Sequence, residues 1–211
     1  MKKTFVLVVL FILPLVAYLF FASGVNNFGK LPILTTNLPE LTNFKGDIKL
    51  QNKITILGFL GHEIEKRRGN AFNLNQKIYK RFGEFNDLQF VMVVPEGTEE
   101  KTLDLKKELG ELSDVAKWNF VYGTDDEITA FFTSMKTGIQ LDADMGTPYV
   151  FIVDKALNLR GRNDDEDEGV KYGFNTNSVA ELNNKMEDDV KIILAEYRLA
   201  LKKNNADRSE Q

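Results

Sequence analysis

A long uncharged segment near the N-terminus divides this sequence into two parts. The 19 residues from Thr4 to Ala22 contain no charged side chain and are rich in Leu, Val and Phe. As an α-helix, such a run is roughly 28 Å long, which matches the hydrocarbon core of a bilayer. We therefore expect residues 1–23 to form an N-terminal transmembrane anchor, followed by one folded domain.

Charges on either side of this segment predict its orientation. Lys2 and Lys3 precede it, whereas the next basic residue, Lys30, comes well after it. This bias favours a cytoplasmic N-terminus and a single-pass protein of the cell (inner) membrane with an extracytoplasmic, periplasmic domain. The alternative is a cleaved signal peptide. Its apolar region is usually shorter and followed by small residues, whereas Phe20 and Phe21 lie here.

The composition excludes several classes of function. The 211-residue chain contains no cysteine, which rules out disulfides, thiolate nucleophiles and thiolate metal ligands. Its net charge of −4 argues against binding of nucleic acid, because phosphates require a basic face. With 43% hydrophobic and 27% charged residues, the part after the anchor is expected to have an ordinary globular core.

Alternating strand and helix patterns predict an α/β domain. We expect strands at residues 47–51, 54–60, 88–94, 118–122, 148–154 and 159–162, and helices at residues 70–84, 100–112, 124–135 and 178–197. Two of these helices begin with the spacing of a capping box, at Thr124 and at Ser178. Strand–helix alternation implies parallel pairs, and a hairpin turn at residues 155–158 implies an antiparallel edge. The order predicts a central mixed sheet with helices on both faces.

The remaining segments complete the expected domain organisation. Residues 24–45 contain Pro32 and Pro39 and have no sustained periodicity, so they form either a linker or stalk or a segment lying on the domain. The folded domain is expected at residues 46–203, followed by a disordered tail at residues 204–211.

Three stretches of the sequence point together to a known fold. They are Ile54–Phe59, followed by a helix containing Asn73-Leu74; Leu88–Pro95; and Pro148–Asp154, followed by Leu159-Arg160-Gly161. With the element order, they resemble the thioredoxin superfamily and, within it, most closely the membrane-anchored Sco/SenC proteins, which assist copper delivery to cytochrome oxidase. The resemblance implies a thioredoxin-like three-layer α/β/α fold with a central mixed sheet, preceded here by one transmembrane helix.

The groups that carry the family's chemistry are missing from this sequence. The family's Cys-x-x-x-Cys motif follows the first of these strands, and its cysteines would fall near His62 and Lys66. The family's copper-binding histidine would lie before the strand ending at Asp154, where the sequence is Asp144-Met145-Gly146-Thr147. We therefore do not carry over copper delivery or dithiol exchange, and expect no cofactor. Gly146-Thr147-Pro148 resembles the thioredoxin segment with a cis-proline, so we expect Pro148 to be cis.

A charged loop before the first long helix supplies the candidate binding residues. His62 is the only histidine and could act as a proton shuttle or a single metal ligand. Lys66 and Arg67 could bind a carboxylate or phosphate beside a helix N-terminus, whose free N–H groups attract anions. Together with Thr147 and Pro148, these residues are expected to form a binding groove.

Ordinary solvated surface charge is the alternative explanation for this loop. Glu63 and Glu65 can balance the charges of Lys66, Arg67 and Arg68. Similarly, residues 163–169 (Asn-Asp-Asp-Glu-Asp-Glu-Gly) offer oxygen ligands but do not match the twelve-residue calcium loop with its closing glutamate. We expect that stretch to be an exposed, mobile loop.

Three functions are compatible with these residues. The first is a redox-inactive thioredoxin-like domain that acts as a binding and assembly module for a protein partner at the extracytoplasmic membrane face, linked to respiratory-complex biogenesis. The second is thiol-independent metal (copper) handling by His62 with Met145, Asp142, Asp144 or acidic residues of 163–169. The third, an enzyme, would require His62 and a carboxylate, but the spacing indicates no nucleophile. An enzymatic role is therefore the least expected of the three.

Overall fold

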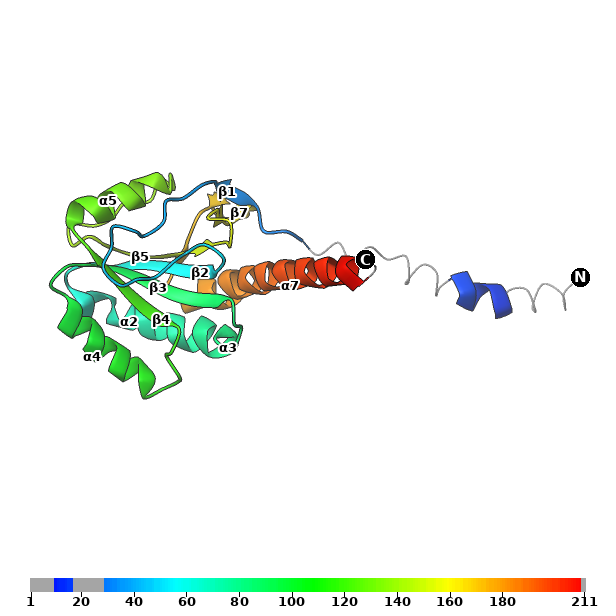
Figure 1. Cartoon of the computed structure of the whole chain (residues 1–211), viewed down its shortest axis with the longest axis horizontal. Coiled ribbons are helices and arrows are strands. Elements are labelled where there is room, and N and C mark those ends of the chain that lie inside the picture. Colours follow the sequence, from blue (N-terminus) through cyan, green and yellow to red (C-terminus); the bar gives the residue numbers. More distant parts are fainter. Residues whose placement is uncertain (1–9, 17–28, 210–211) are drawn as a thin grey trace, which may run out of the picture.

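The domain is built on one mixed β-sheet with helices on both faces (Figure 1). The computed structural model describes residues 10–16 and 29–209. The strands of this sheet are β1 (Ile33–Thr35), β2 (Ile54–Leu60), β3 (Leu88–Pro95), β4 (Trp118–Gly123), β5 (Gly146–Val153), β6 (Leu159–Arg160) and β9 (Phe174–Asn175). Their order is β1-β6-β5-β2-β3-β4, with β9 paired to β5.

The helices follow the strands in the expected alternation. They are α2 (Ile64–Leu74), the π-helical turn η1 (Asn75–Tyr79), α3 (Lys80–Phe82), α4 (Glu99–Gly110), α5 (Asp125–Ser134), α6 (Val179–Glu181), the π-helical turn η2 (Leu182–Met186) and α7 (Glu187–Ser209). Strands β2, β3 and β4 are parallel, whereas β5 is antiparallel to β2 and β6. The predicted mixed sheet is therefore confirmed.

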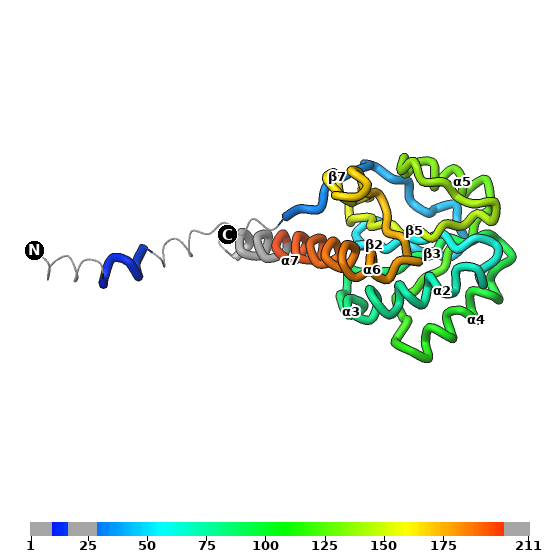
Figure 2. The backbone as a smooth tube through the Cα atoms, turned by 180° about the vertical axis from the view of Figure 1, so that it is seen from behind, coloured from blue at the N-terminus to red at the C-terminus, as the bar shows by residue number. Residues whose placement is uncertain are grey.

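Side chains of the central strands point alternately into two apolar cores. In β2, Ile56 packs with the helices α2, α4 and α7, whereas Leu57 packs with α5 and the N-terminal segment. All seven residues of β2 and all eight of β3 are buried. Because both faces of these strands are buried, their sequences are nearly continuous apolar runs instead of alternating apolar and polar residues. Figure 2 shows α2, α4 and α7 on one side of the sheet, and α5 with the N-terminal segment on the other.

The segment before β2 lies on the domain. Leu31, Leu38 and Leu41 are each 3% exposed, and β1 pairs with β6. Residues 29–45 are therefore a segment lying on the domain, the second of the two expected alternatives, and not a stalk. The strand expected at residues 47–51 is wrong, because the carboxylate of Glu40 accepts hydrogen bonds from the backbone N–H groups of Leu50 and Gln51, at 2.9 and 2.7 Å. A side chain thus binds donors that a neighbouring strand would have used.

Residues near both ends of the described chain are helical. Helix α7 continues to Ser209, so residues 204–209 are helical and the expected disordered tail is wrong there. The expected membrane span, Thr4–Ala22, lies mostly outside the described residues, and residues 10–16 within it are helical. Within the residues that are described, none of the helices combines the length and the apolarity needed to cross a bilayer.

The acidic stretch at residues 163–169 is ordered. It forms most of a hairpin between β7 (Arg162–Asp165) and β8 (Gly169–Lys171), a two-stranded sheet of its own. Apart from buried Asp165 the stretch is exposed, as expected, but it forms a hairpin where a loop was expected. Charge repulsion among its carboxylates is relieved because Arg162, Lys171 and Lys185 form ion pairs with them or with the adjacent helix.

Pro148 is trans, since no peptide bond in the described residues is cis. The expected cis-proline is therefore wrong. The pairing of β2 with β5 shifts register between Gly58 and Phe59, which leaves Pro148 and Tyr149 in a β-bulge. A bulge accommodates proline because it requires no ladder hydrogen bond from that residue, so the trans bond fits the strand without a turn.

Candidate functional site

The candidate site begins where β2 ends and α2 starts. Gly61 has φ +76°, and a Cβ atom added to it would lie 2.4 Å from the carbonyl oxygen of Asp144. Only glycine combines this left-handed conformation with so close an approach. The chain after β2 is thereby held against the loop that precedes β5.

A carboxylate from that loop occupies the N-terminus of α2. Asp144 accepts hydrogen bonds from the backbone N–H of Glu63 at 3.0 and 3.2 Å, and its carbonyl oxygen accepts one from the N–H of His62 at 2.9 Å. Helix N-termini leave N–H groups unpaired and attract negative charge. The anion expected to bind here from outside is therefore replaced by a group of the chain itself.

Arg67 faces the same loop. Its guanidinium forms an ion pair with Asp142, and its side chain is only 13% exposed. The second oxygen of Asp142 accepts hydrogen bonds from the N–H groups of Asp144 and Gly146, both at 3.0 Å. These contacts hold residues 142–146 in a tight turn in which Met145 has φ +62°. Arg67 thus stabilises the loop and has little surface left for a ligand.

His62 lies on the outer surface and contacts α5. Its Nε2 atom is 2.9 Å from Oδ1 of Asp125, and the two side chains are 45% and 56% exposed. The Nζ atom of Lys101, from α4, lies 3.4 Å from the carbonyl oxygen of His62. An aspartate can orient an imidazole, but a pair this exposed is strongly screened by water.

The remaining basic side chains of the loop are paired locally. Lys66 lies 3.0 Å from Glu63, and Arg68 lies 3.5 Å from Glu65 and 2.5 Å from Glu108. The hydrogen bond to Glu63 raises the pKa of Lys66. This cluster therefore agrees with the alternative explanation from the sequence, in which neighbouring glutamates balance ordinary surface charges.

Comparison with known proteins places the domain in a fold. No family model matches the chain, and no curated protein matches it. Among solved structures, it is similar to a protein from Aquifex aeolicus VF5, with 18% identity over 76% of this chain and 92% of that chain, at a TM-score of 0.51. It is equally similar to BsSco, a member of the Sco family of cytochrome c oxidase assembly proteins, with 16% identity, the same coverage of 76% and 92%, and a TM-score of 0.51. The fold is thioredoxin-like. The resemblance to Sco/SenC proteins expected from the sequence is thus confirmed at the level of fold.

The expected groove is not open in this thioredoxin-like domain. Thr147 is 5% exposed and, with Asn70 and Thr176, lines a cavity of about 10 Å³, which suits at most one water molecule. The carbonyl oxygen of Pro148 accepts hydrogen bonds from the N–H and the hydroxyl of Thr176, at 2.9 and 2.6 Å. His62 turns to Asp125 instead of Pro148. Of the five expected binding residues, His62 and Lys66 are exposed, Arg67 and Pro148 are partly buried, and Thr147 is buried. Their binding roles stay predictions.

Asp142 and Asp144 were expected only as possible metal ligands, and their contacts in this site, like that of Asp125, were not predicted from the sequence. Asp125 contacts His62, Asp142 contacts Arg67, and Asp144 contacts the backbone N–H of Glu63, and each pair is far apart in sequence. For Asp125 a signal existed: it follows the end of β4, and the carboxyl ends of parallel strands meet at one edge of a sheet. Nothing local marks Asp142 or Asp144 as partners of α2.

The geometry bears on metal binding as well. Among the side chains of residues 10–16 and 29–200, no three His, Asp or Glu are grouped so that they could hold a metal ion. Asp142 and Asp144, two of the oxygen ligands considered from the sequence, are already bound to Arg67 and to backbone N–H groups. What this face offers is a charged surface.

Proposed function

We propose that this chain is a binding and assembly module that uses a thioredoxin-like scaffold without thiol chemistry. One observation carries the proposal: the N-terminus of α2 is occupied by Asp144, and the adjacent Arg67 by Asp142. A position suited to reaction or anion capture is therefore closed by the chain's own side chains. The uncharged segment Thr4–Ala22 supports attachment to the cell membrane, with the domain on the extracytoplasmic side.

The exposed surface around His62 is the proposed contact for a protein partner. Its side chains come from three elements, α2, α4 and α5, which the sheet holds in fixed relative positions. His62, Lys66 and Asp125 are each about half exposed, at 45%, 53% and 56%. Binding surfaces on rigid elements lose little conformational entropy on association, which suits recognition.

The class of partner is suggested by the structural neighbour BsSco. That protein is described as a member of the Sco family of cytochrome c oxidase assembly proteins. We infer a partner that takes part in the assembly of a respiratory complex. Since the identity is only 16%, the inference rests on fold and on the predicted membrane location together.

Deletion of the gene in the organism that encodes it tests this function. We expect the membranes to lose assembled cytochrome c oxidase and its activity, and the full chain to restore both. The double variant His62→Ala/Lys66→Ala should restore less, whereas Gln76→Ala/Lys80→Ala, which changes exposed residues at the other end of the same helical segment, should restore fully. Normal oxidase assembly in the deletion strain would refute the proposal.

Metal handling through His62 is the competing function, and the same protein tests it. Purified full chain, incubated with micromolar copper and then desalted, should retain no stoichiometric metal if the binding module is correct. Retention of one equivalent that disappears in His62→Ala would instead favour a single-histidine metal carrier.

A further inference from the structure

The β7–β8 hairpin lies on the domain without belonging to its cores. It forms a separate two-stranded sheet, with Arg162 opposite Lys171 and Asp165 opposite Gly169. Of the apolar side chains in the two described cores, none comes from residues 162–171. Its one aliphatic side chain, Val170, is 43% exposed. Apolar burial therefore contributes little to holding the hairpin in place.

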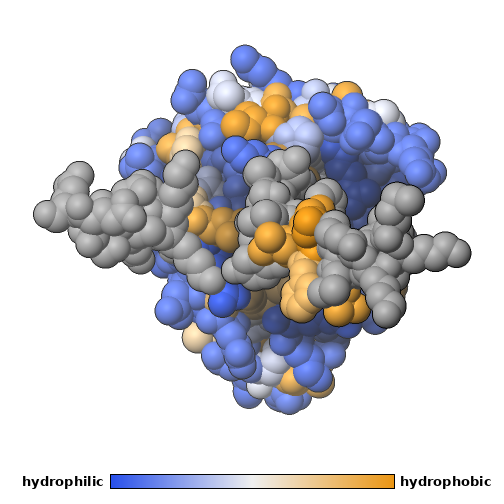
Figure 3. Space-filling view, turned by 90° about the vertical axis from the view of Figure 1, so that its right-hand side faces the viewer, coloured by the Kyte–Doolittle hydropathy of each residue, from blue (hydrophilic) through white to orange (hydrophobic). Residues whose placement is uncertain are grey.

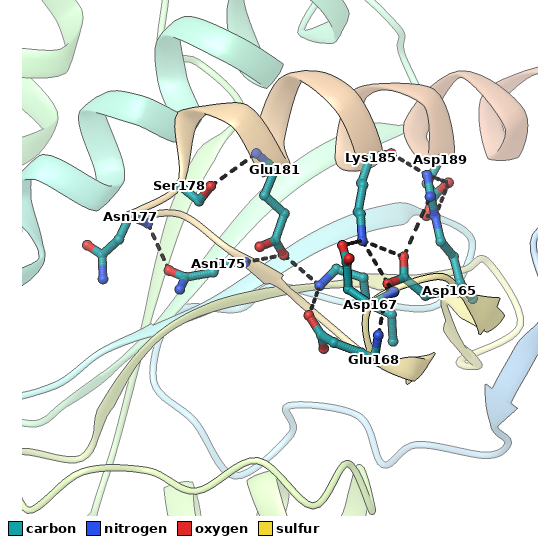
Figure 4. A network of polar contacts seen from close by, with 11 residues as sticks. Asp165, Asp167, Glu168, Asn175, Asn177, Ser178, Glu181, Lys185 and Asp189 are labelled. Carbon is teal, nitrogen blue, oxygen red and sulfur yellow. Dashed lines mark hydrogen bonds and ion pairs between the residues drawn. The ribbon is translucent and has the colours of Figure 1, made fainter.

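Ion pairs with η2 and α7 hold one side of the hairpin. The Nζ atom of Lys185 lies 2.7 and 2.8 Å from the two oxygens of Asp165 and 2.6 Å from Asp167 (Figure 4). These hydrogen bonds, the one to Asp165 foremost, raise the pKa of Lys185. The guanidinium of Arg162 donates two parallel hydrogen bonds, of 2.9 and 2.8 Å, to the carboxylate of Asp189. The side chains of Asp165 and Asp189 are 1% and 2% exposed.

A third cation attaches the other strand. The ammonium group of Lys171 is fully buried and lies 2.8 Å from Glu181 of α6, and it also pairs with Glu168 in the hairpin turn. Burial lowers the pKa of Lys171, but the hydrogen bonds that its ammonium donates to Glu168 and Glu181 outweigh this effect and raise the pKa above its ordinary value. All three cations of the interface are thus charged and paired.

A cleft of about 500 Å³ opens beside the hairpin. Its walls are residues 29–32 of the N-terminal segment, Asp164 and Glu166 of the hairpin, and Asn184 and Ile192 of the helix. Seen from the end towards which α7 projects, the molecular surface is largely hydrophilic, with small separate apolar patches (Figure 3). The hairpin forms one wall of this cleft, and ion pairs connect that wall to η2 and α7.

We propose that the β7–β8 hairpin is a strap that swings away from η2 and α7 as one unit and widens this cleft while the rest of the domain stays folded. In a buried ion pair, Coulomb attraction is largely offset by the loss of hydration. When the hairpin leaves, its carboxylates and the three cations regain water. The ring of Phe174, over which Lys171 lies, is uncovered, while the central strands stay packed between the two cores. Opening consequently requires less free energy than global unfolding, as in other sub-global transitions.

The natural absence of cysteine allows a direct test on the full chain. Glu166→Cys in the hairpin and Asn184→Cys on η2, both exposed, give the only two sites for spin labels, whose separation is measured by pulsed electron resonance. Lys185→Met in this background removes the ammonium and keeps an apolar stem. The matched control is Lys191→Met, whose ammonium pairs with Glu187 and Asp188 inside the helix and not with the hairpin.

We expect a minor population of long label separations in the parent protein. Lys185→Met should raise that population about tenfold or more, since buried Asp165 then has only Arg162, a residue of the hairpin itself, at 3.7 Å. The Lys191→Met control should match the parent, and the emission of buried Trp118 should be unchanged in all three proteins. A single short separation in the parent and in Lys185→Met would overturn the proposal. So would a long separation that appears only together with altered Trp118 emission.

Discussion

The carboxylate of Asp144 lies over the first turn of α2, 3.0 and 3.2 Å from the backbone nitrogen of Glu63. The two residues are separated by 81 positions in sequence, so the contact joins the loop before β5 to the helix after β2. These contacts connect the chain after β2 to the loop before β5 at the N-terminus of α2.

Removal of this carboxylate should weaken the domain measurably. Asp144→Ala leaves the N–H of Glu63 without its acceptor, and we expect a loss of about 1 kcal/mol in the free energy of unfolding. Asp144→Asn, which keeps an acceptor oxygen, should lose less. Urea unfolding followed by Trp118 fluorescence measures both. Equal stability of Asp144→Ala and the parent would contradict the role assigned to this contact.

Two glycines at either end of the same segment should respond in opposite directions to alanine. Gly61→Ala places a methyl group against the carbonyl oxygen of Asp144 at a position with φ +76°, so we expect destabilisation by at least about 1 kcal/mol. Gly69 lies inside α2 with open space around it, so Gly69→Ala should stabilise by about 0.5–1 kcal/mol. Thermal unfolding of the two variants provides the comparison.

Local patterns in the sequence predicted much of the fold. The continuous apolar runs at Ile54–Leu60 and Leu88–Pro95 are the central strands, since both faces of the sheet are covered. The capping box at Thr124 is present with both of its hydrogen bonds. At Ser178 only the hydroxyl bond to the N–H of Glu181 forms, because the Glu181 carboxylate binds Asn175 and Lys171 instead.

Long-range contacts explain what the sequence did not predict. Strand β1 has three residues, and its pairing with β6 depends on a segment more than a hundred residues away. The order of the acidic hairpin depends on Lys185, which lies on a later helix. The closure of the site depends on the loop that holds Asp144. In each case the deciding partner is set by topology, which periodicity and local spacing do not report.

Acid should weaken the contact between α3 and α7. The hydrogen bond from Lys191 and the nearby charge of Arg81 lower the pKa of Glu187 below its ordinary value of 4.5. A carboxylate with a lowered folded pKa contributes stability above its unfolded pKa, and this is lost as pH falls through the folded value. The stability difference between the parent and Glu187→Gln should therefore be full at pH 6 and shrink below about pH 4.5.

The control for that titration is Glu84→Gln, which changes an exposed glutamate for which the described residues provide no ion-pair partner. As an exposed substitution, it should change the stability of the domain very little. A pH-independent difference for Glu187→Gln would show that the ion pairs of Glu187 do not contribute to folding.

Arg160 connects three distant parts of the chain, and its loss should be the most damaging single change. Its guanidinium lies 2.9 Å from Asp154 and 2.6 Å from Glu196 of α7, and its Nε atom donates to the carbonyl oxygen of Leu31 at 2.8 Å. The side chains of Arg160 and Asp154 are 4% and 2% exposed.

Arg160→Met leaves the buried carboxylate of Asp154 without a cation, which we expect to destabilise the domain by about 3–5 kcal/mol. Arg160→Lys keeps the charge but loses the planar fork, so it should recover only part of this. The exposed Arg198 provides the matched control, since Arg198→Met should change the urea midpoint very little. Comparable midpoints for Arg160→Met and Arg198→Met would rule out a structural role for the buried guanidinium.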